Sequence, residues 1–422
     1  MSQGDDMSKK KIVFVASYFY PDYASTGQLL TELCLELQHH FDITVIAVQP
    51  EIEAAQTNKK KLFEEDYLEQ IRIVRLRAPS VDKTNKLSRI KFIVSYFFLA
   101  IVALMKQREV DLIYTISSPP VIGGLIGAVG KLMRRTKLVY NIQDFNPEQA
   151  EAISYTRQKW LFKIARGLDN ISCRASNHII TVGKDMQETL VSRFRGSRVP
   201  VNSVINNWTD EEDIVPLQRD HPKIKQFLAE HQLENKFIVM YSGNLGLYYD
   251  LENIIQITSD FKDNPEFMFV FIGEGGVKKK MEQYVKNHEI SNVLFLPFQP
   301  KDKIKYTLNA AHVHLVVNQK GIKGVSVPSK IYGVMAAGKP IIGVLEKGSE
   351  ASSLIENSGC GVVVEPHSYR DLVRSIETIA QMNRNVLDQV GLKGRTYLEN
   401  HLAKKTAIEK YKHLLQMVSN NG

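Results

Sequence analysis

The chain is predicted to fold as two α/β domains, each built around a doubly wound, Rossmann-like parallel sheet. Its 422 residues exceed what one ordinary hydrophobic core supports. Short apolar, β-branched runs alternate with longer amphipathic stretches, which is the pattern of parallel strands covered by helices on both faces. This alternation stops once, near Ile205, and then restarts. The interruption predicts domains over residues 1–205 and 206–398.

Six strands are predicted in residues 1–205, because six short apolar runs are each bounded by polar or turn-forming residues. Helices are expected between them, for example over Thr26–His39 and Ser88–Gln107. The predicted strands are Ile12–Ser17, Ile43–Val48, Ile71–Leu76, Leu112–Ile116, Leu138–Ile142 and Ile179–Val182.

The polar stretch Asn206–Asp210 and the residues up to Pro216 separate the domains. Beyond them six more strands are predicted, and Leu402–Met417 is predicted to be a helix with no strand after it. Residues 399–422 are therefore treated as a separate terminal segment. The strands of the second domain are Phe237–Tyr241, Met268–Ile272, Val293–Leu296, Val313–Val317, Pro340–Leu345 and Gly361–Val364.

The composition indicates a globular protein of the cytoplasm, with 44% hydrophobic and 24% charged residues. Cys34, Cys173 and Cys360 are odd in number and far apart, which favours neither a disulfide framework nor a metal site. The acidic run Glu64–Asp66 is expected to be solvated surface. No metal is implied, because the histidines at 39, 40, 312 and 314 lack nearby carboxylate partners in the sequence.

The net charge of +8 is concentrated in the first domain. Residues 1–205 carry 28 Lys and Arg against 21 Asp and Glu, whereas the rest carries 26 against 25. Phe92–Met105 is apolar around every face of a helix and has basic residues on both sides, but it is shorter than the ~20 residues of a spanning helix. It is either a core helix or a helix docked on an anionic membrane surface. Nucleic acid is disfavoured, because aromatic residues are not interleaved with the basic ones.

Ligands of open α/β sheets bind beyond the carboxyl ends of the strands, which selects the loops that matter. In the second domain, Gly243, Asn244 and Gly246 follow the first strand, and their backbone can fold N–H groups around phosphate oxygens. Gly273 and Glu274 form a second turn after the next strand. Ser329 and Lys330 begin a short helix, where unpaired N–H groups and a full positive charge suit a diphosphate.

In the first domain the corresponding loops present Ser25, Thr26 and Gly27 after the first strand, with Thr26 as a possible helix cap. Asp144 follows a later strand and is placed to orient or deprotonate an acceptor hydroxyl, with Glu148 as the reserve. Each of these residues could instead serve only as a structural cap. Neither a P-loop nor a dinucleotide-binding fingerprint is present.

Over essentially its whole length from Lys11, the sequence resembles the GT-B fold glycosyltransferase family 4 of retaining enzymes. The resemblance rests on Ser242–Gly246, Ile272–Gly275, Leu296–Pro300 and above all Pro328–Pro340. Bacterial amino-sugar transferases of O-antigen, capsule or colanic-acid assembly are the most similar members. The resemblance implies that the last helix crosses back to the first domain.

The resemblance also implies that Gly243, Asn244, Gly246, Ser329 and Lys330 bind the donor. Many relatives carry two glutamates at the positions of Val325 and Gly333, so Glu365 is a candidate substitute for the one that binds the donor ribose. Many relatives have Arg and Lys where this chain has Leu247–Asp250. The diphosphate charge would then fall to Lys330, with Lys320 or Lys323 as helpers.

The function that this resemblance implies is transfer of a sugar, of the N-acetylated hexosamine type, from a nucleotide diphosphate such as UDP to a lipid-linked saccharide acceptor. Such a protein would be peripheral on the inner face of the cell membrane and would need no cofactor beyond the nucleotide sugar. Two alternatives stay open: a UDP-sugar epimerase of the same fold, and a non-catalytic protein that binds nucleotide sugars.

Overall fold

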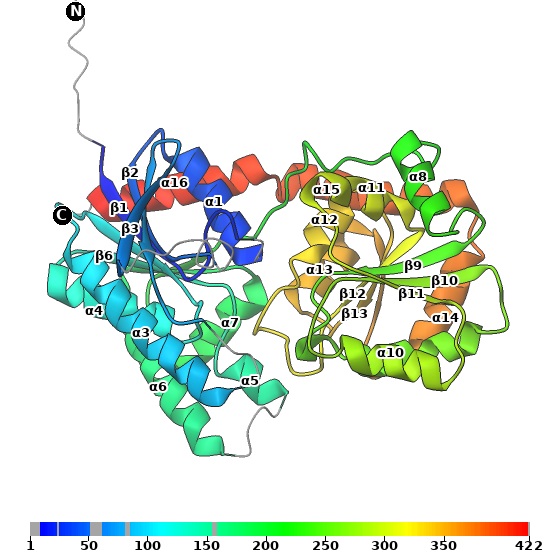
Figure 1. Cartoon of the computed structure of the whole chain (residues 1–422), viewed down its shortest axis with the longest axis horizontal. Helices are drawn as coiled ribbons and strands as arrows, with labels where there is room; N and C mark the ends of the chain where they lie inside the picture. Colours follow the sequence, from blue (N-terminus) through cyan, green and yellow to red (C-terminus); the bar gives the residue numbers. More distant parts are fainter. Residues whose placement is uncertain (1–8, 23–24, 51–60, 81–84, 154–157, 421–422) are drawn as a thin grey trace, which may run out of the picture. The chain divides into compact units, whose positions relative to one another are not determined.

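The computed structural model describes residues 9–22, 25–50, 61–80, 85–153 and 158–420. The chain divides into two compact units (Figure 1). Unit 1 comprises residues 1–148, 156–206 and 407–422, and unit 2 comprises residues 149–155 and 207–406. The three cysteines are free and buried.

Unit 1 is built on an eight-stranded sheet of order β3-β4-β2-β1-β5-β6-β7-β8. All neighbouring strands are parallel except β3, which runs antiparallel to β4 along the edge. The order reverses direction between β1 and β5, which makes the carboxyl ends of these strands the switch point of the sheet. The strands are β1 (Lys11–Val15), β2 (Asp42–Val48), β3 (Phe63–Leu68), β4 (Ile71–Leu76), β5 (Leu112–Ile116), β6 (Lys137–Ile142), β7 (His178–Thr181) and β8 (Asn202–Val204).

Helices cover both faces of this sheet (Figure 1). The helices α3, α4 and α6 pack side by side over one face, where Tyr96, Leu104 and Ile126 join strand residues in a shared core. The last helix, α16, belongs to this unit through its residues from Ala407 onward. The helices are α1 (Ser25–Leu37), α3 (Lys86–Met105), α4 (Ile122–Arg134), α6 (Lys159–Ala175), α7 (Lys184–Arg193) and α16 (Lys404–Asn420). The short helix α5 (Glu148–Ala152) begins at the last residue of a unit 1 segment, and its other residues belong to unit 2.

Unit 2 is built on a six-stranded, wholly parallel sheet of order β11-β10-β9-β12-β13-β14. Its switch point lies between β9 and β12. Most side chains of these strands are buried, as a sheet covered on both faces requires. The strands are β9 (Phe237–Ser242), β10 (Phe267–Ile272), β11 (Val293–Leu296), β12 (Val313–Val317), β13 (Ile341–Val344) and β14 (Gly361–Val364).

The helices of unit 2 form two layers with separate cores. One core cluster packs η2, α10 and α14 on the sheet, a second packs α12, α13 and α15 on it, and a third packs α8 and α11 on it. The helical segments are α8 (Pro222–Glu230), η1 (Leu247–Tyr249), α9 (Leu251–Ile254), η2 (Ile255–Phe261), α10 (Lys278–Asn287), α11 (Lys301–Ala310), α12 (Lys330–Ala336), α13 (Glu350–Ser358), α14 (Tyr369–Ala380) and α15 (Arg384–His401).

The predicted fold class is confirmed, and all twelve predicted strands are present with ends shifted by two residues at most. Two strands were not predicted. In β3 the residues Glu64–Asp66, expected as plain solvated surface, pair with arginines of β4: Glu65 with Arg72, and Asp66 with Arg75. The return of the last helix to the first unit is also confirmed. There Tyr411 accepts a hydrogen bond of 2.8 Å from the amide of Asn141.

Candidate functional site

The two glycine turns of unit 2 interlock at the carboxyl ends of β9 and β10. The N–H of Gly243 donates to the carbonyl of Ile272 (2.9 Å), and the N–H of Leu245 donates to the carbonyl of Glu274 (2.9 Å). Both Gly243 and Gly273 have positive φ angles, of 149° and 140°. A Cβ on Gly273 would lie 1.9 Å from the carbonyl oxygen of Gly243. Only glycine permits this close approach.

Lys330 is the first residue of α12, and its side chain reaches the turn that follows β9. Its Cε lies 3.1 Å from where a Cβ of Gly243 would stand. The ammonium nitrogen lies 4.0 Å from the ring centroid of Tyr249 and 4.7 Å from that of Tyr241. The hydroxyl of Tyr241 donates to the carbonyl of Asn244 (2.7 Å), which ties the aromatic ring to the turn. The two segments predicted to hold a diphosphate are therefore neighbours.

The charge of Lys330 has no carboxylate to balance it among the residues that the structure describes. Desolvation by burial lowers the pKa of this lysine to about 7. Two tyrosine rings attract a cation but replace only part of its hydration. An incoming diphosphate would supply the missing counter-charge, since a buried charge is stable only when it is paired.

The predicted helpers of Lys330 are placed differently. Lys320 is exposed, and Lys323 donates its ammonium to the carbonyl of Lys347 (2.8 Å). Glu346, which the sequence analysis did not select, accepts from the N–H groups of Gly321 (2.8 Å) and Lys323 (2.9 Å) and so fixes this loop.

Glu365 follows β14 at the same edge of the sheet, exposed, and accepts from the N–H of Lys347 (3.0 Å). Three strand spacings of about 4.8 Å separate β14 from β9, which is roughly 14 Å. The role of Glu365 as the ribose ligand stays a prediction. Glu274, also exposed, forms an ion pair with Lys278 (2.6 Å). Asn244 is exposed, Gly246 is buried and Ser329 is half-buried.

In unit 1, Asp144 follows β6 and is part-buried. The hydroxyl of Ser117, at the end of β5, accepts from the N–H groups of Gln143 (3.0 Å) and Asp144 (3.2 Å). Next to it, the hydroxyls of Ser17 and Ser118 lie 3.3 Å apart. The carboxyl edge at the switch point of unit 1 therefore presents hydroxyl groups and one carboxylate. The serines were missed from the sequence because single serines at strand ends carry no distinctive pattern.

Glu148 is held by arginines. Arg166 donates to its carboxylate at 2.9 Å, and Arg193 pairs with both Glu148 and Asp169. Burial alone would raise the pKa of Glu148, but the charges and hydrogen bonds of the arginines outweigh it and the pKa falls below its ordinary value. These contacts give Glu148 a structural task, and its reserve catalytic role stays a prediction.

The acceptor-side loop is described only in part, because residues 23 and 24 lie outside the described ranges. Ser25 begins α1, so Thr26 lies within the first turn and not before it as a cap. Gly27 is buried, and a Cβ there would meet the Cβ of Tyr18 at 3.1 Å. The space that a side chain at position 27 would take is therefore occupied by Tyr18.

The part of the sequence that forms this site matches a known protein family. Residues 223–396 match the model of the family described as glycosyl transferases group 1. Unit 2 is a glycosyl transferases group 1 domain. The matched range contains the glycine turns, Lys330 and β9 to β14. The resemblance stated from the sequence is confirmed, and the chain is a glycosyltransferase of GT-B fold.

Relatives extend the similarity beyond this domain. The chain is 24% identical over 407 residues to "Probable glycosyltransferase WbjE" of Pseudomonas aeruginosa, covering 95% of this chain and 96% of that protein. It is 31% identical over 179 residues to "Putative colanic acid biosynthesis glycosyl transferase WcaI" of Escherichia coli strain K12, covering 42% of each. The fold is similar to Anabaena HepE in complex with UDP, with a TM-score of 0.71, 16% identity, and coverage of 96% and 100%.

The described histidines of the glycosyltransferase lie in the core or at the surface. Among the described residues, no group of three or more His, Cys, Asp or Glu side chains could hold a metal ion. His314 is a core residue whose Nε2 lies 2.9 Å from the carbonyl of Leu308, and the Nδ1 of His312 accepts from the N–H of Ile238 (2.9 Å). His39 and His40 are exposed.

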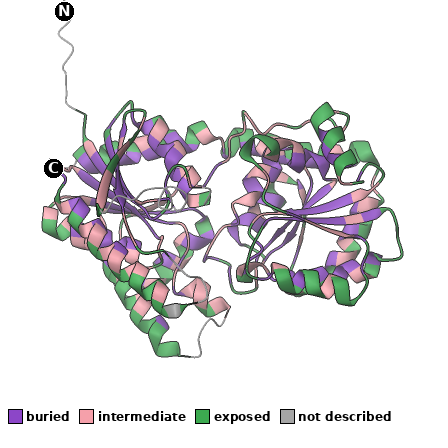
Figure 2. Cartoon of the chain, in the orientation of Figure 1, coloured by how far each residue is buried: buried purple, intermediate pink, exposed green. Residues whose placement is uncertain are grey.

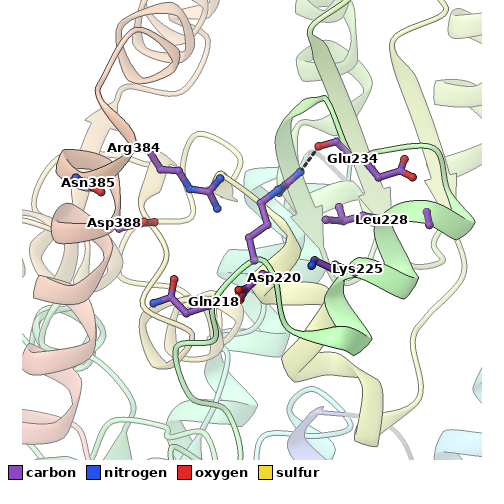
Figure 3. Close-up of a pocket in the computed structure, with 10 residues that line it drawn as sticks. Gln218, Asp220, Lys225, Leu228, Glu234, Arg384, Asn385 and Asp388 are labelled. Atoms are coloured by element: carbon purple, nitrogen blue, oxygen red, sulfur yellow. Dashed lines mark hydrogen bonds between the residues drawn. The ribbon is translucent and has the colours of Figure 1, made fainter.

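A cavity of about 670 Å³ lies in another part of unit 2 (Figure 3). It is lined by residues that precede β9 and by the first turn of α15, so it opens at the amino-terminal edge of the sheet, away from Lys330. Its charged residues balance as three basic and three acidic side chains. They are Arg219, Lys225, Arg384, Asp220, Glu234 and Asp388.

Proposed function

We propose that this glycosyltransferase moves a sugar of the N-acetylated hexosamine type from UDP to a lipid-linked saccharide acceptor, with retention of the anomeric configuration, in the biosynthesis of a surface polysaccharide. Two relatives support the class of product and donor. WcaI is named for colanic acid biosynthesis, and HepE was solved with UDP and with UDP-glucose.

The observation that carries the proposal is the unpaired ammonium of Lys330 beside the glycine turns. A site for a neutral ligand has no need of a cation whose pKa burial has lowered to about 7. A diphosphate does, because its charge must be neutralised away from water. The glycine turn lies beside that charge, with the Cε of Lys330 3.1 Å from the Cβ position of Gly243, and glycine-rich backbone turns of this kind bind phosphate oxygens.

The chemistry follows from these groups. The bond between the anomeric carbon and the β-phosphate oxygen breaks, and the acceptor oxygen bonds to the same face of the sugar. The acceptor proton passes to the leaving phosphate. Lys330 and backbone N–H groups stabilise the charge that develops on the diphosphate, so the proposed reaction uses no resident metal. Asp144 orients the acceptor hydroxyl.

The lipid-linked acceptor is proposed from the surface of unit 1. Of the described helices, one is long and apolar enough to cross a membrane by length and composition, Leu87–Met105 in α3, and 22% of that window is buried. A core helix would be mostly buried. We infer a protein that is peripheral on the inner face of the cell membrane, with α3 as part of its contact.

The test compares Lys330→Ala and Asp144→Ala with Lys279→Ala, an exposed lysine on α10. We expect Lys330→Ala to lower transfer by roughly 10²–10³-fold and to abolish the thermal shift given by UDP-sugars. Asp144→Ala should lower transfer and keep that shift, and Lys279→Ala should do neither. A panel of UDP-, GDP-, ADP- and dTDP-sugars that leaves the melting temperature of the parent protein unchanged would refute the donor site. Turnover without an acceptor would indicate the epimerase.

A further inference from the structure

The helices α3, α4 and α6 form one layer whose outer side carries exposed apolar residues. On α3 the exposed apolar residues recur every three or four positions and so form one stripe. Phe98, in the middle of this stripe, is 63% exposed, while Tyr96 and Ala100 of the same helix are fully buried in the core. The stripe consists of Leu87, Ile90, Val94, Phe98 and Val102.

A second stripe lies on α6, in a part of the chain that the sequence analysis did not single out. Trp160, at 57% exposure, begins it at the first turn of the helix. The opposite face of α6 is buried through Phe162, Asp169 and Cys173, so the stripe faces outward. It consists of Trp160, Leu161, Ile164, Leu168 and Ile171.

The two stripes belong to one layer. The helix α4 packs against both α3 and α6, and its exposed residues Leu132 and Met133 extend the surface. Figure 2 shows exposed residues along the outer sides of these helices. The twelve apolar side chains together offer on the order of 1,000 Å², against the few hundred Å² typical of a monomer. A surface of this size calls for a partner.

The charge of the layer decides which partner fits. The three helices carry nine Lys and Arg residues and a single acidic residue, Asp169. Asp169 is buried and paired with Arg193, so it does not offset the basic residues at the surface. A second copy of the chain, paired symmetrically, would bring this basic surface against itself. Anionic lipid headgroups would instead neutralise it while the apolar stripes enter the acyl boundary.

We propose that the surface formed by α3, α4 and α6, the membrane face, seats unit 1 in the interface of an anionic bilayer with both stripes inserted. Trp160 marks the depth of insertion, because indole rings prefer the headgroup level. Lys159 and Lys163, on either side of it and both exposed, contact the headgroups. The assignment deepens the proposed function, since it names the surface at which a lipid-linked acceptor is met. The membrane face itself does not depend on the proposed function, but its role in meeting a lipid-linked acceptor does.

Flotation with vesicles tests the membrane face on the full chain. The parent protein should float with vesicles of phosphatidylglycerol and phosphatidylcholine and lose binding as salt rises. Ile164→Glu/Ile171→Glu should weaken partitioning roughly tenfold or more. Lys159→Ala/Lys163→Ala should weaken it by a similar factor on anionic vesicles alone. Val386→Glu, a 52% exposed site on α15 in unit 2, is the matched control and should float like the parent.

The emission of Trp160 gives a second readout. The chain has two tryptophans, and Trp208 is 4% exposed, so Trp160→Phe removes the accessible signal. Anionic vesicles should shift the difference spectrum to the blue, and brominated lipids should quench it. A parent protein that does not float, or an α6 variant that floats equally well, would overturn the proposal. So would a dimer that the α6 variant dissociates without any vesicle binding. UDP binding by the α6 variant should be unchanged, so failure of the donor site is recognised separately.

Discussion

Arg193 in unit 1 and Lys330 in unit 2 are both cations withdrawn from solvent, and their surroundings are opposite in charge balance. Arg193 in unit 1 is paired with Glu148 and Asp169 and lies 4.3 Å from the ring centroid of Phe145. Burial works to lower its pKa, but the two carboxylates raise it above its ordinary value. Lys330 in unit 2 lies beside the rings of Tyr241 and Tyr249, and burial lowers its pKa to about 7.

This difference separates a structural cation from one that awaits a ligand. The carboxylates around Arg193 come from the protein, so the network is complete without any substrate. The environment of Lys330 lacks such groups among the described residues, and the turn at Gly243 adjoins its side chain. Glu148 belongs to the structural side of this comparison, because its carboxylate already pairs with Arg193 and Arg166.

The largest effect is expected from Arg193→Ala. It leaves the buried carboxylate of Asp169 without a cationic partner and Glu148 with Arg166 alone, and it should lower the free energy of unfolding by about 3–5 kcal/mol. The paired Glu148 has a lowered pKa, so its contribution is present above its unfolded pKa and is lost as the pH falls through the folded value. The loss should therefore be greatest at neutral pH and shrink in acid. Denaturant unfolding measures it, with exposed Arg195→Ala as the control.

The glycine turns provide the next test. A Cβ on Gly273 would collide with the carbonyl of Gly243, whereas a Cβ on Gly276 would meet nothing within 4 Å. Gly273→Ala should weaken UDP binding by about 2–3 kcal/mol, because the turn must open. Gly276→Ala should bind UDP like the parent protein. Titration calorimetry compares the two, and equal affinities would show that the turns do not shape the donor site.

A smaller effect concerns the pH dependence of donor binding. Above about pH 7 the free site holds a neutral Lys330, and a diphosphate favours the charged form. Affinity should then fall by up to about tenfold per pH unit above 7, and binding should take up a proton. Calorimetry at pH 8 in buffers of different ionisation enthalpy measures the number of protons taken up on binding. Lys330→Arg should bind without it, since arginine stays charged.

The comparison also shows what the sequence could predict. Strands such as β9 and β10 are continuous apolar runs, and Gly243, Gly273 and Lys330 follow strands or begin a helix, so the rule for open sheets located them. The strand β3 was missed because its Glu64–Asp66 run is polar. The backbone ladder with β4 and the ion pairs of Glu65 and Asp66 with arginines of β4 hold it at the edge of the sheet. The tyrosine contacts of Lys330 were missed because Tyr241 and Tyr249 reach that lysine only through the three-dimensional path of the loop.

The smallest effect should be on the stability of the free protein. Lys330 has a folded pKa of about 7 and an unfolded pKa near 10.4, so the unfolded state binds more protons between these values and stability rises with pH across that window. Lys330→Met removes the cost of burying the charge. It should raise the free energy of unfolding by about 1 kcal/mol below pH 7, a modest value because the side chain is part-exposed. The gain should disappear as the pH approaches 10. An equivalent gain at all pH values would mean that packing, and not the unpaired charge, sets the difference between Lys330 and Arg193.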